Sequence, residues 1–212
     1  PRTIIATEMS DDRLQSLLER LAPLAQANGR TLLTFNPQSE GRPLRDFVRE
    51  VTDGKGADDV VVSVPIAEVM AEADTLMNAD GMLVFFAGVP NGTLAPLNLS
   101  AVYLANAQYT GTSGLTIDDQ QQVVDLADRG ELSPGSIVGA IGGMRAAKDG
   151  IQALIEGRYS GKVIIFPQIH DLPLMGLGEL KEKLPEVAAK LGPGDMWNNE
   201  AEKALLENHW RG

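Results

Sequence analysis

Apolar residues in this chain alternate between short continuous runs and stretches in which they recur at helical spacing. The run Asp59–Val64 has valine at four of its six positions, and Met82–Ala87 is a second apolar run. Between them, apolar residues recur at positions 66, 69, 70, 73, 76 and 77, and Asn-Ala-Asp-Gly at 78–81 is expected to end the helix. Two apolar strands joined by an amphipathic helix predict a parallel βαβ unit with a right-handed crossover.

The same alternation of strand and helix patterns extends from residue 2 to residue 130. Further strands are predicted over Arg2–Glu8, Thr31–Phe35 and Gln108–Thr112. Helices are predicted after Ser10, from Pro43 and after Thr116, where capping residues precede apolar residues at helical spacing. A shorter helix is favoured within Leu99–Ala107. This order of elements predicts a doubly wound α/β sheet.

Beyond residue 135 the pattern changes to two further strands and several helices. The predicted elements are a strand at 136–141, a helix at 144–157, a strand at 162–167, a loop at 171–178, and helices at 179–191 and 200–210. Charged residues are frequent in the helical segment after His170, which we interpret as an appendix packed on the surface of the body. Trp197 and Trp210 are expected to anchor this segment at half-buried seams, because their rings are amphipathic.

One part of a nucleotide-binding sheet is absent from the sequence. A dinucleotide-binding domain opens with a strand, a G-x-G-x-x-G turn and a helix, and the chain contains no such motif. In the strand order 3-2-1-4-5-6, the absent first strand would lie in mid-sheet, between Arg2–Glu8 and Asp59–Val64. The predicted fold is therefore a Rossmann-like, doubly wound, mostly parallel sheet that lacks its first strand and Gly-rich loop, with a helical C-terminal extension.

Composition narrows the possible chemistry. The 212 residues carry a formal net charge of −11 and include no cysteine and two histidines. An acidic chain is a poor partner for nucleic acid or an anionic membrane, and without cysteine it has no disulfide, thiolate metal ligand or cysteine nucleophile. No apolar run reaches the ~18 residues that span a bilayer, and no secretory signal opens the chain, so we expect a cytoplasmic protein.

Four stretches of the chain resemble one protein family. They read TIIATEMSDDRL, TDGKGADDVVVSVP, NADGMLVFFAGVP and GGMRAAKDGIQALIEGRYSGKVIIFPQ. In this order they are similar to the C-terminal half of a medium-chain, zinc-type alcohol dehydrogenase, and the last stretch is most similar to the branch of sorbitol dehydrogenases and sorbose-1-phosphate reductases. The resemblance implies a partial Rossmann domain over 1–135, a helix and strand over 136–170 that return to a GroES-like catalytic domain, and a helical extension over 171–212.

The resemblance implies an NAD(P)-dependent enzyme that transfers hydride between nicotinamide and a secondary alcohol of an alcohol, polyol, sugar or sugar phosphate. Zinc is expected only in the GroES-like catalytic domain, which these residues do not include, so the chain would supply the cofactor half and no catalytic or metal-binding residue is assigned to it. Two alternatives stay open. One is a degenerate Rossmann domain that binds a nucleotide or a partner without chemistry, and the other is a methyltransferase-like fold.

An acidic residue ends the first predicted strand. In Rossmann folds a carboxylate at this position accepts hydrogen bonds from the adenosine ribose and repels a 2′-phosphate. Glu8 matches that position by the resemblance, which predicts NAD in preference to NADP. The alternative interpretation of Glu8 is a solvated acid at the end of a strand.

The remaining candidate residues follow other strands, because ligands of open parallel sheets bind beyond the carboxyl ends of the strands. The resemblance assigns the adenine and ribose side to Ser63, Val64 and Pro65, the nicotinamide side to Ala87, Gly88 and Val89, and contacts with the nicotinamide amide to Gly111, Thr112 and Ser113. Gly88 and the Gly111–Gly114 stretch could equally be ordinary turn residues. Arg145 is a weaker candidate for binding a substrate phosphate, and its alternative is a solvated helix start.

A short edge strand is predicted over Thr93–Leu97. An exposed sheet edge is a liability unless it is paired or covered. By the resemblance, this strand would pair across a two-fold axis and extend the sheet through a homodimer, or through a tetramer built from it.

Overall fold

The strands of the chain form three separate sheets. The computed structural model describes residues 1–112 and 114–210, and its sheets have the strand orders β1-β2, β3-β4-β5 and β7-β6-β8. The chain divides into two compact units. Unit 1 contains residues 1–4, 12–32 and those from Ile117 onward, and unit 2 contains residues 5–11 and 33–116. The predicted domain boundaries at residues 135 and 170 stay predictions.

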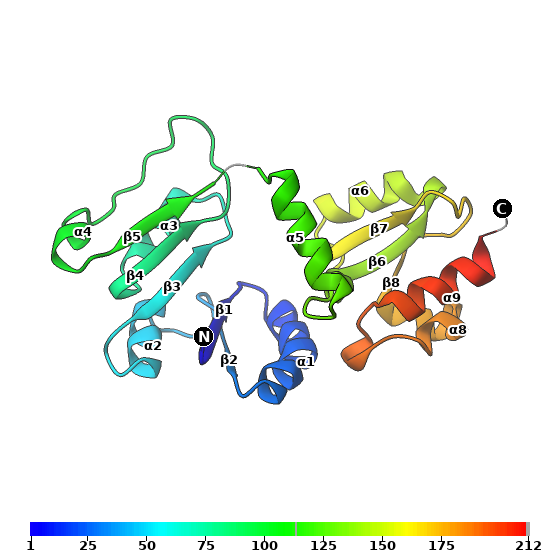
Figure 1. The fold of residues 1–212 in the computed structure, drawn as a ribbon, viewed down its shortest axis with the longest axis horizontal. Helices are drawn as coiled ribbons and strands as arrows, with labels where there is room; N and C mark the ends of the chain where they lie inside the picture. Colours follow the sequence, from blue (N-terminus) through cyan, green and yellow to red (C-terminus); the bar gives the residue numbers. More distant parts are fainter. Residues whose placement is uncertain (113, 211–212) are drawn as a thin grey trace. The chain divides into compact units, whose positions relative to one another are not determined.

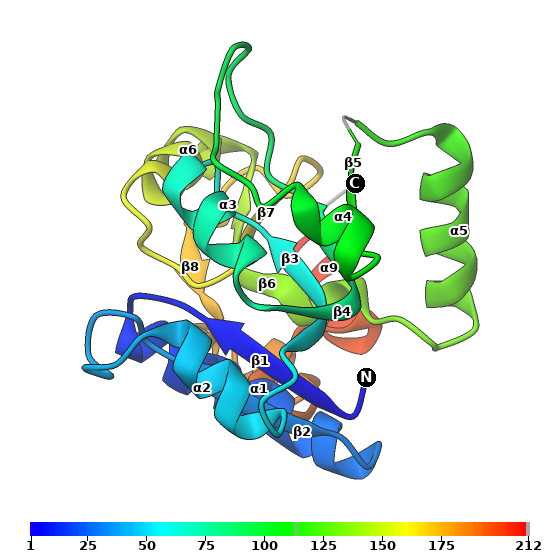
Figure 2. The ribbon, with the colours of Figure 1, turned by 90° about the vertical axis from the view of Figure 1, so that its left-hand side faces the viewer.

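The first sheet consists of two parallel strands, β1 (Thr3–Thr7) and β2 (Thr31–Phe35), connected by α1 (Asp11–Ala27). Thr31 N–H donates to the Arg2 carbonyl at 2.9 Å, and Glu8 N–H donates to the Phe35 carbonyl at 3.3 Å, so both strands run in one direction (Figure 2). The fully buried Phe35 packs on Phe47 of α2 (Leu44–Val51), with ring centroids 5.1 Å apart. The strand and helix predictions for this region are confirmed.

The predicted βαβ unit forms the second sheet, within unit 2. Strands β3 (Ala57–Val62) and β4 (Met77–Phe85) are parallel, and α3 (Ala67–Asp74) connects them (Figure 1). The helix contributes Met70 and Ala73 to a buried cluster with Val62 and Leu83 of the strands. The chain continues through α4 (Ser100–Leu104) to the parallel edge strand β5 (Gln108–Gly111). This packing fixes the three strands in one register.

Two local predictions in unit 2 are wrong. The sequence at 78–81, expected to separate helix from strand, belongs to β4, and α3 already ends at Asp74. This polar segment forms an irregular part of the strand. Asp80 has φ 61°, and its N–H donates to the Ala105 carbonyl at 2.7 Å. The pairing register between β3 and β4 shifts between Ala57 and Asp59. The predicted edge strand over Thr93–Leu97 does not form, because these residues make no ladder and follow a loop instead.

The absence of a central strand is visible in the pairing. Within the described residues, β1 pairs only with β2, and β3 pairs only with β4. The orders β2-β1 and β3-β4-β5 are the two sides of a doubly wound sheet from which the strand between β1 and β3 is missing. The predicted fold class is confirmed: a Rossmann-like α/β arrangement without its first strand.

The third sheet lies in unit 1 and is organised around β6 (Val138–Gly143). Strand β7 (Lys162–Phe166) pairs with β6 in parallel, and β8 (Met175–Gly176) pairs with it antiparallel. One prediction is corrected here, because the segment expected to be loop contains β8. The strand KVIIFP pairs with β6, and the return of residues 136–170 to a GroES-like catalytic domain stays a prediction. Helix α6 (Ala147–Ile155) packs on β6 and β7, and α5 (Ile117–Asp128) precedes the sheet.

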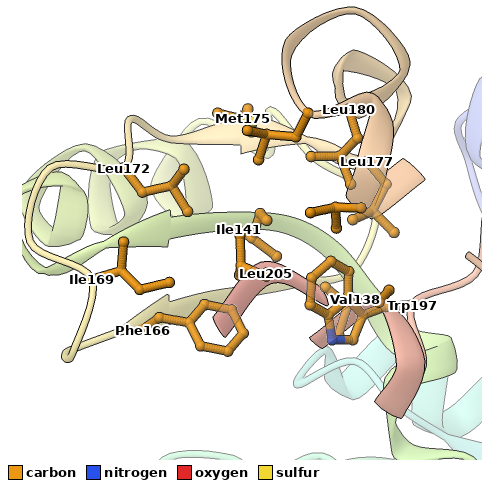
Figure 3. Packing of buried hydrophobic residues seen from close by; sticks show 13 residues of the cluster. Val138, Ile141, Phe166, Ile169, Leu172, Met175, Leu177, Leu180, Trp197 and Leu205 are labelled. Atoms are coloured by element: carbon orange, nitrogen blue, oxygen red, sulfur yellow. The ribbon is translucent and has the colours of Figure 1, made fainter. Parts of the chain in front are cut away.

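The C-terminal segment is not a surface appendix, as the sequence suggested, but supplies most of the largest hydrophobic core. Its elements are the 3₁₀ turns Leu177–Glu179 and Pro193–Asp195, and α7 (Leu180–Lys183), α8 (Pro185–Ala188) and α9 (Asn199–His209). Two further 3₁₀ turns, Pro134–Ile137 and Met144–Ala146, lie directly before and after β6. Trp197 is 3% exposed beside Phe166, and Leu205 of α9 packs near Ile141 (Figure 3). Trp210 is 56% exposed, so its predicted half-buried seam is wrong.

The core of unit 1 explains why a charged segment is ordered. The apolar positions of α7, α8 and α9 face β6, while their charged residues remain outside, which is the usual arrangement of an amphipathic helix. Asn198 caps α9 by accepting a hydrogen bond from Ala201 N–H at 2.8 Å. None of the helices in the described chain is long and apolar enough to cross a bilayer.

Removing a core side chain from the C-terminal segment is expected to destabilise unit 1. Leu205→Ala should lower the free energy of unfolding by about 3 kcal/mol, because it deletes fully buried methyl groups and leaves a cavity. Urea unfolding followed by tryptophan fluorescence measures this change. Leu154→Ala, at a position 53% exposed on α6, is the matched control and should cost less than about 1 kcal/mol. Equal effects of the two substitutions would contradict the core assignment.

Candidate functional site

Three parallel strands of unit 2 end together at one edge of their sheet. In the pairing register, Val62 of β3 lies opposite Phe85 of β4, and Phe85 lies opposite Gly111 of β5. The predicted groups that begin with Ser63 and Ala87, and the pair Gly111 and Thr112, therefore lie at the same carboxyl edge. Ser113, the last member of the third group, lies outside the described residues.

Hydrogen bonds hold the first two groups against each other. The N–H groups of Phe86 and Ala87 donate to the Val62 carbonyl at 3.1 and 3.0 Å. The Val64 carbonyl accepts from Ile66 N–H at 3.0 Å, which turns the chain into α3. The backbone at this edge is therefore fixed by the sheet and by the start of the helix, while Ser63, Val64 and Pro65 remain exposed.

Gly88 has no structural reason to be glycine within the described chain. Its φ is not positive, and no heavy atom lies within 4 Å of the position that a Cβ would occupy. Gly111 differs, because a Cβ there would come within 3.0 Å of the Phe85 carbonyl oxygen, so the approach of β4 accounts for that glycine. A Cβ at Gly88 would therefore meet open space within the described chain.

Glu8 stands immediately beyond the carboxyl end of β1, as predicted. Its Oε1 accepts hydrogen bonds from the N–H groups of Met9 at 2.8 Å and Ser10 at 3.2 Å, which fixes the carboxylate over the first turn before α1. Because β1 and β3 belong to separate sheets, the pairing does not bring Glu8 into register with the other candidate residues. An ionised carboxylate offers acceptors only, which suits ribose hydroxyls.

Asn36 is a residue of this region that the sequence interpretation treated only as a strand stop. It is 4% exposed, and its Nδ2 donates to the Met9 carbonyl at 3.1 Å and to Asp11 Oδ1. Its own Oδ1 accepts from Gln38 N–H at 2.9 Å. Asn36 thereby connects the end of β2 to the turn that carries Glu8. An asparagine between a strand and a proline was the available signal.

Phe86 was also missed. The sequence placed it inside a buried strand, whereas the structure ends β4 at Phe85 and leaves the Phe86 ring 72% exposed at the candidate edge. Val64 and Val89 are partly exposed beside the same strand ends. Exposed apolar side chains next to accessible backbone are typical of a surface that contacts a ligand or another part of a protein.

Arg145 lies elsewhere, in unit 1. It follows β6 in a 3₁₀ turn, and its exposed guanidinium pairs with the carboxylate of Asp171. Among the described residues, no three histidine, aspartate or glutamate side chains are grouped so that they could hold a metal ion. The strand ends of unit 2 thus remain the candidate site that the sequence and the structure support together.

A hydrogen bond between Tyr109 and Asp74 connects strand β5 to α3 and contributes to a raised pKa of the tyrosine. The Tyr109 hydroxyl donates to Asp74 Oδ1 at 2.6 Å, and Asp74 Oδ2 accepts from Asn98 N–H at 2.8 Å. Burial, the hydrogen bond and the Asp74 charge together raise the pKa of Tyr109 to about 12. This contact holds the strand that carries Gly111 and Thr112 beside its neighbours.

No family model matches the chain. It is 36% identical, over 98% of its length, to mannitol-1-phosphate 5-dehydrogenase of Aliivibrio fischeri, and covers 50% of that protein. It is 34% identical, over 76% of its length, to L-sorbose 1-phosphate reductase of Klebsiella pneumoniae, and covers 39% of that protein. The chain therefore spans about half the length, or less, of these curated relatives.

Solved structures share the fold. 2R,3R-butanediol dehydrogenase from Bacillus subtilis matches 78% of the chain with a TM-score of 0.61 at 20% identity, and 44% of that protein is covered. An NAD-dependent alcohol dehydrogenase matches 77% of the chain with a TM-score of 0.56 at 26% identity, and 43% of it is covered. Both likenesses are again to about half of a longer chain.

The raised pKa of Tyr109 makes a contribution to stability that depends on pH. A free tyrosine has a pKa near 10, so between about pH 10 and 12 the unfolded chain loses this proton while the folded chain keeps it. The contribution is fully present below pH 10 and is lost as the pH rises through 12. In a titration of phenolate absorbance, Tyr109→Phe should remove the latest step, and Asp74→Asn should move it to lower pH. Tyr103→Phe, at an exposed site, is the control and should leave the latest step in place.

Proposed function

We propose that the chain holds the nicotinamide cofactor of a medium-chain, zinc-type alcohol dehydrogenase of the polyol and sugar-phosphate branch. Its resemblance to the C-terminal, Rossmann half of such an enzyme supports this proposal. The reaction would transfer hydride between nicotinamide and a secondary alcohol of a polyol, sugar or sugar phosphate. The names of the relatives support an oxidoreductase acting on small polar substrates.

The convergence of three strand ends at one sheet edge is the observation that carries this proposal. Ligands of open parallel sheets bind at this edge, and here Val62, Phe85 and Gly111 end in register. Backbone N–H and carbonyl groups of Ala87–Val89 and of Gly111–Thr112 can orient a planar ring and its amide. The open space above Gly88 fits a nicotinamide ring, because nothing in the described chain fills it.

The preference for NAD over NADP is proposed from Glu8. Its position beyond β1 and its acceptor-only chemistry suit the two hydroxyls of an adenosine ribose, whereas a 2′-phosphate would meet a second negative charge. Ser63, Val64 and Pro65, exposed beyond β3, would contact the adenosine side. The sequence contains no G-x-G-x-x-G turn, so the cofactor pyrophosphate would be held by residues outside this chain.

Zinc chemistry is proposed for a GroES-like catalytic domain beyond these residues. There, zinc would polarise the alcohol oxygen and lower its pKa. The task of this chain would be to hold the cofactor rigidly and to keep the nicotinamide face oriented. Arg145 is retained as a proposed contact for a substrate phosphate. Its ion pair with Asp171 is largely exposed, and exposed ion pairs contribute little free energy, so a phosphate could compete for the guanidinium.

A homodimer is proposed through the segment Thr93–Leu97. Although this segment is a loop here, Leu94 is 88% exposed, and pairing with a second copy would satisfy the backbone groups of an extended segment. In sedimentation velocity the chain should behave as a dimer, and Leu94→Asp should convert it to a monomer. Leu115→Asp, at a comparably exposed leucine, should leave the dimer intact. A monomeric parent chain would contradict the proposal.

The cofactor role can be tested at Gly88. Gly88→Val should weaken NADH binding at least about tenfold, because a branched side chain would occupy the space needed by the ring. The melting temperature should stay within about 1 °C, since a Cβ at this position has no heavy atom within 4 Å. NADH fluorescence in a titration of the 212-residue chain measures the affinity.

Gly178→Val is the matched control. Gly178 also has no heavy atom within 4 Å of a Cβ and no positive φ, but it lies in unit 1. Its substitution should leave NADH affinity unchanged. If Gly88→Val bound NADH as tightly as the parent chain, or if both variants lost affinity equally, the proposed site would be wrong.

A further inference from the structure

A large hollow occurs in unit 1, formed by the segment 168–175 and by residues of α7 and α9. Its volume is about 790 Å³. Sites for small molecules generally fall between about 300 and 1,000 Å³, so this hollow has the size of a ligand site. All of its lining residues belong to unit 1, so the hollow is independent of the cofactor role proposed for unit 2.

The floor of the hollow is apolar and firmly packed. Ile169, Leu172, Met175 and Leu184 line it, and all four are buried members of the core cluster around β6. Figure 3 shows Ile169, Leu172 and Met175 on the same side of the sheet as the C-terminal helices. Because these side chains are held by the core, the hollow keeps its shape without a ligand.

Side chains with nitrogen donors stand along the rim. Lys183, His170 and His209 line the hollow, and the last two are the only histidines of the sequence. Asp171 also lines it, but its carboxylate is paired with Arg145. One ammonium and two imidazoles around a concave site offer hydrogen-bond donors to an anion, which is a local feature in a chain with a net charge of −11.

Two of these side chains are each paired with a carboxylate that does not line the hollow. Lys183 Nζ lies 2.6 Å from Glu179 Oε2, and His209 Nε2 lies 3.0 Å from Glu186 Oε1. The hydrogen bond from Lys183 lowers the pKa of Glu179, and the hydrogen bond with His209 lowers the pKa of Glu186. An ammonium has three donors and an imidazole two nitrogens, so both groups keep capacity for a ligand.

His170 and Trp210 complete the rim. The ring of His170 has no hydrogen-bonding partner within the described residues, although it lies beside the hollow. The indole of Trp210 also lines the hollow and leaves much of its surface exposed. A flat aromatic surface next to hydrogen-bond donors suits a compact organic molecule whose body stacks while its charged end is bound.

We propose that this hollow binds a small organic anion, with a phosphate or carboxylate group accepting hydrogen bonds from His170 and from the remaining donors of Lys183 and His209, and with a carbon skeleton against Trp210 and the apolar floor. A metal ion does not suit the two histidines, because no third ligand is grouped with them in the described chain. Phosphate esters and carboxylates share the required chemistry, and the experiment separates them.

The two histidines give a direct readout. In ¹H–¹³C NMR of the 212-residue chain, the imidazole region contains two Cε1–H signals. Both should shift and saturate during titration with glucose 6-phosphate, with gluconate, or with both, and neither should shift with glucose at equal concentration. Saturation with glucose 6-phosphate would identify phosphate as the bound group, and saturation with gluconate would identify carboxylate. Saturating shifts with neither acid, or equal shifts with glucose, would overturn the proposal.

Variants on one short helix supply the matched control. Lys183→Gln should weaken binding about tenfold, which corresponds to the loss of a charged hydrogen bond. Lys181→Gln removes a lysine of the same helix that pairs with Asp195 and does not line the hollow, so it should leave affinity unchanged. If the two variants lost affinity equally, the shifts would reflect overall charge, and the assigned site would be wrong.

Discussion

Backbone pairing between parallel strands is the constraint on which the architecture of unit 2 depends. A strand in mid-sheet has donors and acceptors along both edges, and all of them need partners. Here β3 pairs on one side with β4, and β1 pairs only with β2. The ladder β3-β4-β5 nevertheless remains in register, because α3 buries Met70 and Ala73 against it. This register brings the ends of three strands to one edge.

Unit 1 satisfies the same constraint in another way. Its central strand β6 has a neighbour on each edge, and α6 and the C-terminal helices supply apolar cover. The strand KVIIFP therefore has a partner within the chain. The charged C-terminal segment becomes ordered because its apolar positions, among them Trp197 and Leu205, face β6. The packing that buries these residues also forms the apolar floor of the hollow in unit 1.

The two candidate sites use different physical means. At the edge of unit 2, backbone groups and a glycine without internal contacts offer an open, nearly uncharged surface, which suits a planar ring with an amide. At the hollow of unit 1, a lysine, two imidazoles and an indole line a concavity, for which an anion is the proposed ligand. In both, a buried core fixes the geometry, and the groups available for binding are those that the core leaves exposed.

The sequence by itself determined the order of strands and helices in unit 2, the absent first strand, the acid at the end of β1 and the family resemblance. These follow from local patterns: apolar periodicity, capping residues, and the position of Glu8 and Gly88 after apolar runs. Tertiary structure alone decided that β4 absorbs residues 78–81, that β8 exists, that Phe86 is exposed, and that His170 and His209 share one hollow. Such features depend on pairing and packing between residues distant in the sequence, which local periodicity does not encode.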